Sequence, residues 1–281
     1  MWRMIFLEHK NADVGMSFEK CDRDGVSMRL ADYVIKKLIE WQVEHIFMVN
    51  GRGILYLTDA VAAERRMHTV CVHHEQAAAY AAVSYAASSR NMGACLLSTG
   101  CASTNAVTGV LCAWQDSVPC IFISGNHMLH ETVRYTGLGI RTFGQQENDI
   151  ISMVENITKY AVMISDPSRI CYELEKAYYM ANEGRKGPVW IDIPLDLQNA
   201  RIEETQLEHF EIPKKAGCVN QQDISYVMRE MEMSQRPVFL IGSGVKSAGA
   251  DKILRQLAQA KNIPVTYSAS AADTIGAGEE V

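Results

Sequence analysis

Short apolar runs alternate with helix-like segments between residues 45 and 193, and this alternation constrains the fold more than any other feature. The runs typical of strands are His45–Val49, Met67–Val72, Gly93–Leu97, Pro119–Ser124, Ala161–Ile164 and Pro188–Ile193. A helix between two strands returns the chain to the same edge of a sheet, so that successive strands pair in parallel. We therefore predict an α/β fold, a doubly wound and mostly parallel sheet with helices on both faces.

The same pattern divides the chain into four parts. Residues 1–27 lack periodicity and are expected to be an irregular extension, with a docking arm as the alternative. An amphipathic run that begins at Met28 opens the first domain, residues 28–200, and the polar stretch 201–221 is predicted to be a linker. Residues 222–281 resume the pattern with two strand-like runs. Since two strands are too few for an independent parallel sheet, we expect an incomplete second α/β, Rossmann-like unit.

Charge and thiol content exclude several classes of protein. Lys plus Arg number 27 against 33 Asp plus Glu, for a net charge of −6, which argues against nucleic-acid and anionic-membrane partners. No apolar run approaches the ~18 residues of a membrane span. The eight cysteines include no Cys-x-x-Cys pair, and the start lacks a signal peptide, so we expect reduced thiols, no metal ligands and a cytoplasmic location. Cys71, Cys95 and Cys120 are expected to be buried.

Polar and small residues gather where the predicted strands end, which is where open α/β sheets bind ligands. Glu75 opens an Ala-rich helix, and taken alone it is more simply a residue that caps that helix. Residues 98–105 form a loop of small residues in which Ser103 or Thr104 could cap the next helix; the simpler alternative is an ordinary tight turn. Asp116 is expected to anchor the turn before Pro119. A further polar run, 143–149, completes the set.

The order of these motifs resembles a known family. The matching residues are His74-Glu75-Gln76-Ala77-Ala78, Thr99-Gly100 through Asn105, Gly109, Asp116-Ser117-Val118-Pro119, Ser124-Gly125, Gln146-Glu147, Gly187-Pro188-Val189 and Asp192-Ile193-Pro194. Together they resemble the N-terminal, pyrimidine-binding domain of thiamine-diphosphate-dependent enzymes of the acetolactate synthase-like family. The resemblance covers about residues 28–200, with a weaker match from 236 to 275 to the start of the family's central domain. By this resemblance the chain ends within that central domain.

The resemblance implies a chemistry and a set of residues. In the family a buried glutamate hydrogen-bonds the aminopyrimidine ring and favours the imino tautomer that deprotonates the thiazolium. The cofactor then removes CO2 from a 2-keto acid, pyruvate being the expected donor, and the two-carbon unit passes to an acceptor carbonyl. The residues implied as catalytic are Glu75 and Gln146, and those implied to bind the cofactor are Gly51, Gly53, Glu75, Thr99, Gly100 and Asn105. His127 and His130 follow on a loop, where solvated side chains are favoured over acid–base groups at the rim.

The departures from the family pattern leave the acceptor open. Gly100-Cys101-Ala102 stands where the family commonly has Gly-Pro-Gly, and Gln145 stands in place of a Phe. No Gly-Asp-Gly occurs in the chain, so the resemblance implies that the diphosphate and Mg²⁺ are held by a domain absent from these residues. It also implies a homo-oligomer with the active site at the subunit interface. Alone, the chain is expected to be inactive, and FAD use is left open.

Two alternatives remain at this point. Within enzymes, a simple 2-keto acid decarboxylase would release free aldehyde instead of joining the two-carbon unit to an acceptor. In a different class, the chain would be a non-catalytic or half-site subunit that offers the pyrimidine face to a separate diphosphate-binding chain. The products formed with and without an added acceptor distinguish a decarboxylase from a carboligase. Whether a Gly-Asp-Gly motif lies on the same polypeptide or on another chain distinguishes the half-site subunit from the enzyme.

Overall fold

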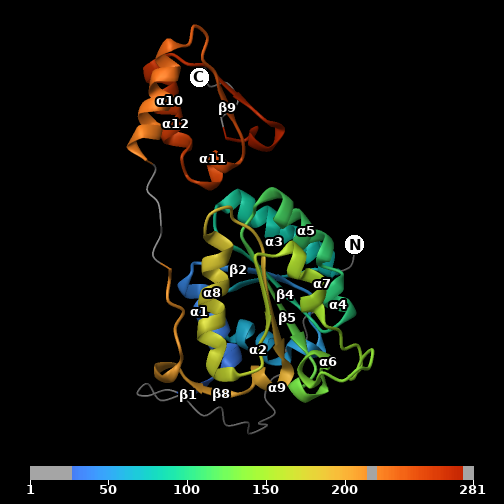
Figure 1. Cartoon of the computed structure of the whole chain (residues 1–281). Helices are drawn as coiled ribbons and strands as arrows, with labels where there is room; N and C mark the ends of the chain where they lie inside the picture. Colours follow the sequence, from blue (N-terminus) through green and yellow to red (C-terminus); the bar gives the residue numbers. More distant parts are fainter. Residues whose placement is uncertain (1–26, 214–219, 275–281) are drawn as a thin grey trace, which may run out of the picture.

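A six-stranded parallel sheet forms the centre of the larger of two α/β units (Figure 1). The computed structural model describes residues 27–213 and 220–274. In sheet order the strands are β3 (His68–Cys71), β2 (His45–Met48), β4 (Gly93–Leu97), β5 (Cys120–Asn126), β7 (Val189–Pro194) and β6 (Tyr160–Met163). All neighbouring pairs in this sheet are parallel. The predicted α/β, doubly wound parallel sheet is confirmed.

Helices cover both faces of this sheet (Figure 1). On one face lie α1 (Leu30–Glu40), α2 (Leu55–Ala63) and α8 (Ile170–Asn182). The opposite face carries α3 (Glu75–Ser89), α5 (Val107–Asp116) and α7 (Ile150–Val154). The shorter helices α4 (Cys101–Thr104), α6 (Val133–Thr136) and α9 (Leu195–Gln198) lie in the connections. Because each helix buries one stripe against the sheet, the sheet's two faces give two separate apolar cores.

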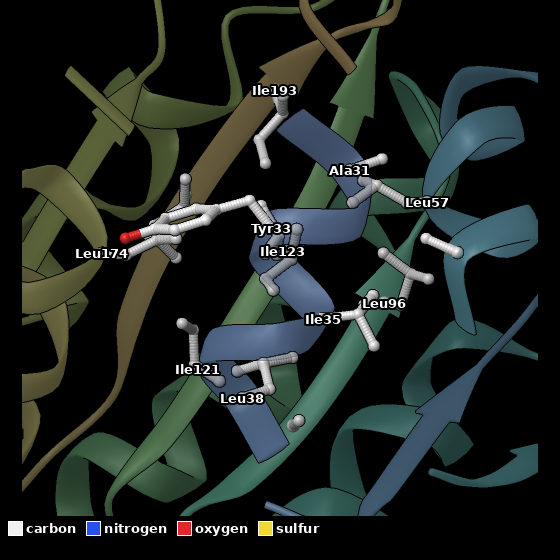
Figure 2. Packing of buried hydrophobic residues seen from close by; sticks show 14 of the residues in the cluster. Ala31, Tyr33, Ile35, Leu38, Leu57, Leu96, Ile121, Ile123, Leu174 and Ile193 are labelled. Atoms are coloured by element: carbon white, nitrogen blue, oxygen red, sulfur yellow. The ribbon is translucent and has the colours of Figure 1, made fainter. Parts of the chain in front are cut away.

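Strand side chains alternate between these two cores. Ile121 and Ile123 of β5 face α1, whereas Phe122 between them stacks on Trp190 with ring centroids 5.5 Å apart. Figure 2 shows Ile121 and Ile123 beside Leu38 and the other inward-facing residues of α1. Each of these side chains is at most 1% exposed, and burying one stabilises the fold by about 1.5–3 kcal/mol. The amphipathic face predicted for α1 is therefore the face that it buries.

Order extends past residue 200 into the stretch predicted to be a linker. β8 (Arg201–Glu203) pairs antiparallel with β1 (Ser27–Arg29), so the chain closes a small sheet at this point. Ile202 and Leu207 are buried although they stand alone among polar residues. Isolated apolar anchors create no periodicity, which is why the sequence pattern missed them. Of the predicted extension 1–27, only Ser27 is among the described residues, and residues 214–219 are outside them.

The thiol predictions hold in part. Cys95 and Cys120 are fully buried in adjacent strands. The prediction that Cys71 is buried is wrong, since all four residues of β3 are exposed. β3 is an edge strand of the sheet, and apolar neighbours in the sequence do not reveal that position. None of the helices in the described ranges combines the length and apolar character needed to cross a membrane.

The second unit is small. α10 (Gln221–Met233), β9 (Phe239–Ile241), α11 (Gly244–Ser247), α12 (Asp251–Lys261) and β10 (Val265–Tyr267) follow in order. β9 and β10 form a parallel two-stranded sheet, as the two strand-like runs predicted. Polar contacts join this unit to the first: Arg90 pairs with Asp251 at 3.2 Å, and the Lys186 ammonium donates to the Ser247 carbonyl at 3.0 Å.

Candidate active site

A cavity of about 340 Å³ opens at the carboxyl ends of β2, β4 and β5. The chain passes from β2 to β3 on one side of β2, and then returns to β4 on the other side. The loops after β2 and β4 therefore diverge, which leaves a crevice at this switch point of the sheet. Five of the residues implied by the family resemblance line the cavity: Gly51, Gly53, Glu75, Thr99 and Gln146.

Two glycines let the loop after β2 lie directly on the loop after β4. A Cβ atom on Gly51 would lie 2.3 Å from Ser98 Oγ, and one on Gly53 would lie 1.7 Å from Thr99 Oγ1. The Gly53 amide also donates to Ser98 Oγ at 3.2 Å. Because no side chain fits at either glycine, the two loops interlock and form a fixed floor for the cavity.

Gly100 and Gln146 meet in a second close approach. Gly100 has a φ of +62°, and a Cβ atom there would lie 1.5 Å from the Gln146 carbonyl oxygen. Gln146 itself has a φ of +65°, a conformation that residues other than glycine rarely adopt. Strained backbone of this kind gathers at functional loops. The positive φ therefore marks Gln146, whose side chain is exposed at the cavity, as a candidate functional residue.

Glu75 is half-buried at the start of α3 and faces the cavity. Asn105, which follows α4, donates from Nδ2 to Glu75 Oε2 at 2.9 Å. The interpretation of Glu75 as the cap of its own helix is wrong, because His74 is the N-cap and its Nδ1 accepts from the Gln76 amide at 3.1 Å. The Glu75 carboxylate therefore does not cap the helix; it faces the cavity and is oriented by its hydrogen bond from Asn105.

A buried polar network supports the floor of the cavity. The Asp192 carboxylate, 1% exposed, accepts from Ser124 Oγ at 2.6 Å and from Asn126 Nδ2 at 2.7 Å. Trp190 Nε1 donates to the same Ser124 oxygen at 2.9 Å. Burial raises the pKa of Asp192 to about 7, against the lowering effect of the two hydrogen bonds. Asn126 reaches the cavity wall, and its Oδ1 accepts from the His127 amide at 2.9 Å.

His127 lines the cavity, and its side chain is only 15% exposed. The solvated side chain favoured by the sequence is therefore not what the structure shows for this histidine. Nε2 contacts the Gln145 carbonyl, and a Cβ atom on Gly144 would lie 2.7 Å from the ring. His130 is exposed, as expected. No sequence signal distinguishes the two histidines, since their difference arises from the loop folded over His127.

Glu147 holds that loop in place. Its buried carboxylate accepts from the Val133 amide at 3.2 Å and from the Phe143 amide at 3.1 Å. Glu147, the neighbour of Gln146, therefore holds both ends of the loop 133–143. The sequence motif Gln146-Glu147 thus joins a side chain at the cavity to a structural anchor.

Residues of two predicted motifs do not line the cavity. Ser103 donates its hydroxyl to the Ser98 carbonyl and Thr104 donates to the Cys101 carbonyl at 2.8 Å, so neither caps α5, whose N-cap is Ala106. Asp116 is exposed at the end of α5 and lines a separate cavity of about 490 Å³ between the two units. The motif from Asp116 to Pro119 therefore lies away from Glu75 and Gln146.

Comparison with known proteins agrees with this geometry. The family described as "thiamine pyrophosphate enzyme, N-terminal TPP binding domain" matches residues 28–153. The acetolactate synthase large subunit of Haemophilus influenzae is 32% identical over 242 residues, 85% of this chain and 41% of that protein. A probable acetolactate synthase large subunit of Methanocaldococcus jannaschii is 34% identical over 246 residues, 85% of this chain and 40% of that protein. The acetolactate synthase large subunit of Lactococcus lactis is 31% identical over 253 residues, 88% of this chain and 42% of that protein. The chain thus spans about two fifths of the length of these relatives.

Proposed function

Since the chain contains the N-terminal TPP-binding domain of the acetolactate synthase-like family, we propose that its cavity binds the aminopyrimidine end of thiamine diphosphate. The proposed reaction is decarboxylation of a 2-keto acid, pyruvate being the expected donor, followed by transfer of the two-carbon unit to an acceptor carbonyl. The observation that carries the proposal is the pairing of Asn105 with Glu75 at the cavity, 2.9 Å between Nδ2 and Oε2.

The residues present fit a flat, hydrogen-bonding ring. Gly51 and Gly53 add no side chains to the floor of the cavity, where their loop lies directly on Ser98 and Thr99. The Glu75 carboxylate reaches the same cavity from α3. Among the described residues, Glu75 Oε1 has no hydrogen-bond partner in the fold, whereas Oε2 is held by Asn105. One carboxylate oxygen is therefore available to a ligand.

Each side chain has a proposed task. When bound, the cofactor supplies the electron sink that decarboxylation requires. Glu75 holds and exchanges a proton at the pyrimidine ring, and Asn105 keeps the carboxylate turned toward that ring. Gln146 and His127, on the opposing wall, orient the substrate and exclude water. Glu147 and Asn126 act through these two residues, by fixing the loop and the His127 amide.

The remaining parts of the reaction centre are proposed to come from elsewhere. The diphosphate and Mg²⁺ would be held by a domain with the Gly-Asp-Gly motif, which these 281 residues lack. FAD use stays open. A cytoplasmic location is also proposed, supported by cysteines that are free throughout the described ranges.

A homo-oligomer with the site at its interface is part of the proposal. The outer surface of α3 and α5 supports it, because Tyr80, Leu111 and Trp114 are each 38–40% exposed there. Tyr80 and Cys112 are in contact across the two helices, so these side chains form one apolar surface. Leu111→Glu is expected to shift the sedimentation of the oligomer toward the monomer, whereas Ile253→Glu, on the second unit, is expected to leave it unchanged.

Proton exchange at thiamine C2 tests the proposed role of Glu75. We expect Glu75→Gln to slow H/D exchange by orders of magnitude, because an amide cannot share the proton with the ring. The measurement is made in enzyme that contains a diphosphate-binding domain, whether on the same polypeptide or on a second chain. Glu44→Gln, an exposed glutamate at the other end of β2, serves as the control. Near-normal exchange in Glu75→Gln would remove Glu75 from this role.

Binding by the 281-residue chain alone tests the division of the site. Titration calorimetry with thiamine diphosphate is expected to show weak binding or none, because the diphosphate contacts are missing. Tight binding without a second domain would overturn that division. Restored binding and turnover on mixing with a separate diphosphate-binding chain would identify a half-site subunit.

The dependence of the product on an added acceptor distinguishes carboligation from simple decarboxylation. Assays with pyruvate and a panel of aldehydes and ketones are expected to give products that depend on the acceptor added. Free aldehyde as the product under every condition would identify a 2-keto acid decarboxylase instead.

A further inference from the structure

Three metal-ligating side chains meet beside α8, from the buried Cys171 next to α1 out to the exposed His209, and none of them lines the cavity described above. Cys171 and Glu175 stand one helical turn apart, and His209 comes from the segment that follows β8 and runs along α8 (Figure 1). Cys171 Sγ lies 3.4 Å from His209 Nδ1, which in turn lies 3.0 Å from Glu175 Oε1. One ligand atom from each residue falls within 4.8 Å of the others.

We propose that Cys171, Glu175 and His209 form a site for a divalent transition metal of the zinc type. Thiolate, imidazole and carboxylate are the donors that Zn²⁺ takes, in tetrahedral geometry with water as a fourth ligand. Metal–ligand bonds of about 2.0–2.3 Å at tetrahedral angles place the donor atoms roughly 3.3–3.6 Å apart. The two separations observed here differ from that range by at most a few tenths of an ångström. The third, between the ligand atoms of Cys171 and Glu175, is within 4.8 Å, so side-chain rotation that brings these two atoms together would admit the ion.

Neighbouring groups orient the proposed ligands. The Phe210 amide donates to Glu175 Oε2 at 3.0 Å, which leaves Oε1 directed at His209. Lys37 of α1 lies 3.4 Å from Oε1 and would compete with a cation there. Its ammonium also pairs with Glu40 at 3.2 Å, so it keeps a carboxylate partner when a metal takes Glu175. Hydrogen bonds of this kind to the ligands commonly fix metal sites.

The thiol must lose its proton for the metal to bind. Burial raises the pKa of Cys171, and the hydroxyl of Tyr33 and the ammonium of Lys37 are the ionisable groups of α1 that face it. Metal binding is therefore expected to release a proton from Sγ.

The consequence is a clamp between α8 and residues 207–210. That segment leads through residues 214–219 to the second unit, so a metal on these ligands would fix the path of the chain as it leaves the first unit. No short motif indicates such a site, because His209 lies 38 residues beyond Cys171 in the chain.

Titration with Co²⁺, which takes zinc sites and reports its ligands by absorption, tests the proposal on the 281-residue chain. We expect one equivalent to bind, with a thiolate charge-transfer band and the intense visible bands of tetrahedral Co²⁺, and Zn²⁺ to displace it. Cys171→Ser should abolish the charge-transfer band. His209→Ala should weaken binding at least ~100-fold, because loss of a second-shell partner alone costs about 10–100-fold.

Matched controls keep the result specific. Cys71→Ser and His130→Ala remove an exposed thiol and an exposed imidazole elsewhere on the first unit, and should leave the spectrum unchanged. His209→Ala is expected to fold normally, since the side chain is 69% exposed, and circular dichroism checks this. A spectrum without a thiolate band, or one lost equally in Cys71→Ser, would overturn the proposal. Because no thiamine diphosphate is involved, the outcome is independent of the proposed catalytic function.

Discussion

The two units of this chain share one local pattern and differ in how much of it they bury. Leu96 in β4 and Leu240 in β9 are both strand leucines in parallel sheets, yet the first is 1% exposed and the second 74%. The first unit places helices on both faces of six strands, whereas the described residues of the second, 220–274, contain two strands. Both leucines lie in strands of parallel sheets, so the difference teaches that the number of covering layers decides which apolar residues contribute to stability.

The second unit retains a small core. Within its described residues the buried apolar side chains are Ile241, Ala258, Ile263 and Ala271. Larger side chains on the same elements, such as Ile253 at 68% and Met233 at 73% exposure, lie outside that core. We expect the second unit to open at lower denaturant concentration than the first, and to lose amide protection first.

Truncation of the matched leucines should give the largest contrast. Leu96→Ala is expected to cost about 2–5 kcal/mol in free energy of unfolding, because it leaves a cavity between packed layers. Leu240→Ala should change the free energy of unfolding by less than ~0.5 kcal/mol, because that side chain is mostly exposed. Urea denaturation followed by circular dichroism measures both. Equal losses would mean that the second unit is packed as tightly as the first.

The buried carboxylate of the first unit should make its stability depend on pH. Asp192 has a pKa of about 7 in the fold, against 3.8 ordinarily, so the folded state holds the proton more tightly. Its stabilising contribution is therefore complete below pH 3.8 and is lost as the pH rises through 7, by an amount on the order of 4 kcal/mol. The negative charges of the nearby Glu147 and Asp149 also raise the pKa of Asp192.

Asp192→Asn is expected to remove most of that loss between pH 5 and pH 8. Unfolding free energies at several pH values measure it. Asp223→Asn, an exposed position in the second unit, is the control and should retain the wild-type slope. A variant Asp192→Asn with the wild-type slope would show that other groups carry the pH dependence.

A pair of glycines extends the comparison to the backbone. Gly53→Ala places a Cβ atom 1.7 Å from Thr99 Oγ1, so we expect a loss of about 1–3 kcal/mol from overpacking. Gly244→Ala in α11 meets nothing within 4 Å, and should be neutral or stabilising by up to ~1 kcal/mol. Thermal unfolding of both variants measures the difference. A tolerated Gly53→Ala would show that the loops after β2 and β4 are not interlocked.

The ion pair between the units should have the smallest effect. Arg90 and Asp251 meet at the surface, where salt screens them, so Asp251→Asn is expected to lower the amide protection of α12 slightly and only at low ionic strength. Hydrogen exchange at two salt concentrations measures this. A large loss of protection in both conditions would mean that the contact between units stabilises the second one.

The sequence predicted what depends on local pattern and failed where contacts join distant segments. The sheet followed from the alternation of apolar runs, and Glu75 and Gly53 from motif order. Cys71 was placed in the core because its neighbours are apolar, but the edge position of β3 is a property of the whole sheet. The burial of His127 depends on the loop folded over it, and the formation of β8 depends on its partner strand β1, which lies far back in the chain. Contacts of this kind between distant segments produce no local pattern in the sequence.

The contact between Gly100 and the Gln146 carbonyl limits how this site can diverge. Any side chain at position 100 would push the segment 143–147 outward, and would carry Gln146 and the loop against His127 away from Glu75. The segment 143–147 can therefore keep its place at the cavity only while position 100 stays glycine. For a protein engineer, a library would be varied along that loop, and Gly100 would be left alone.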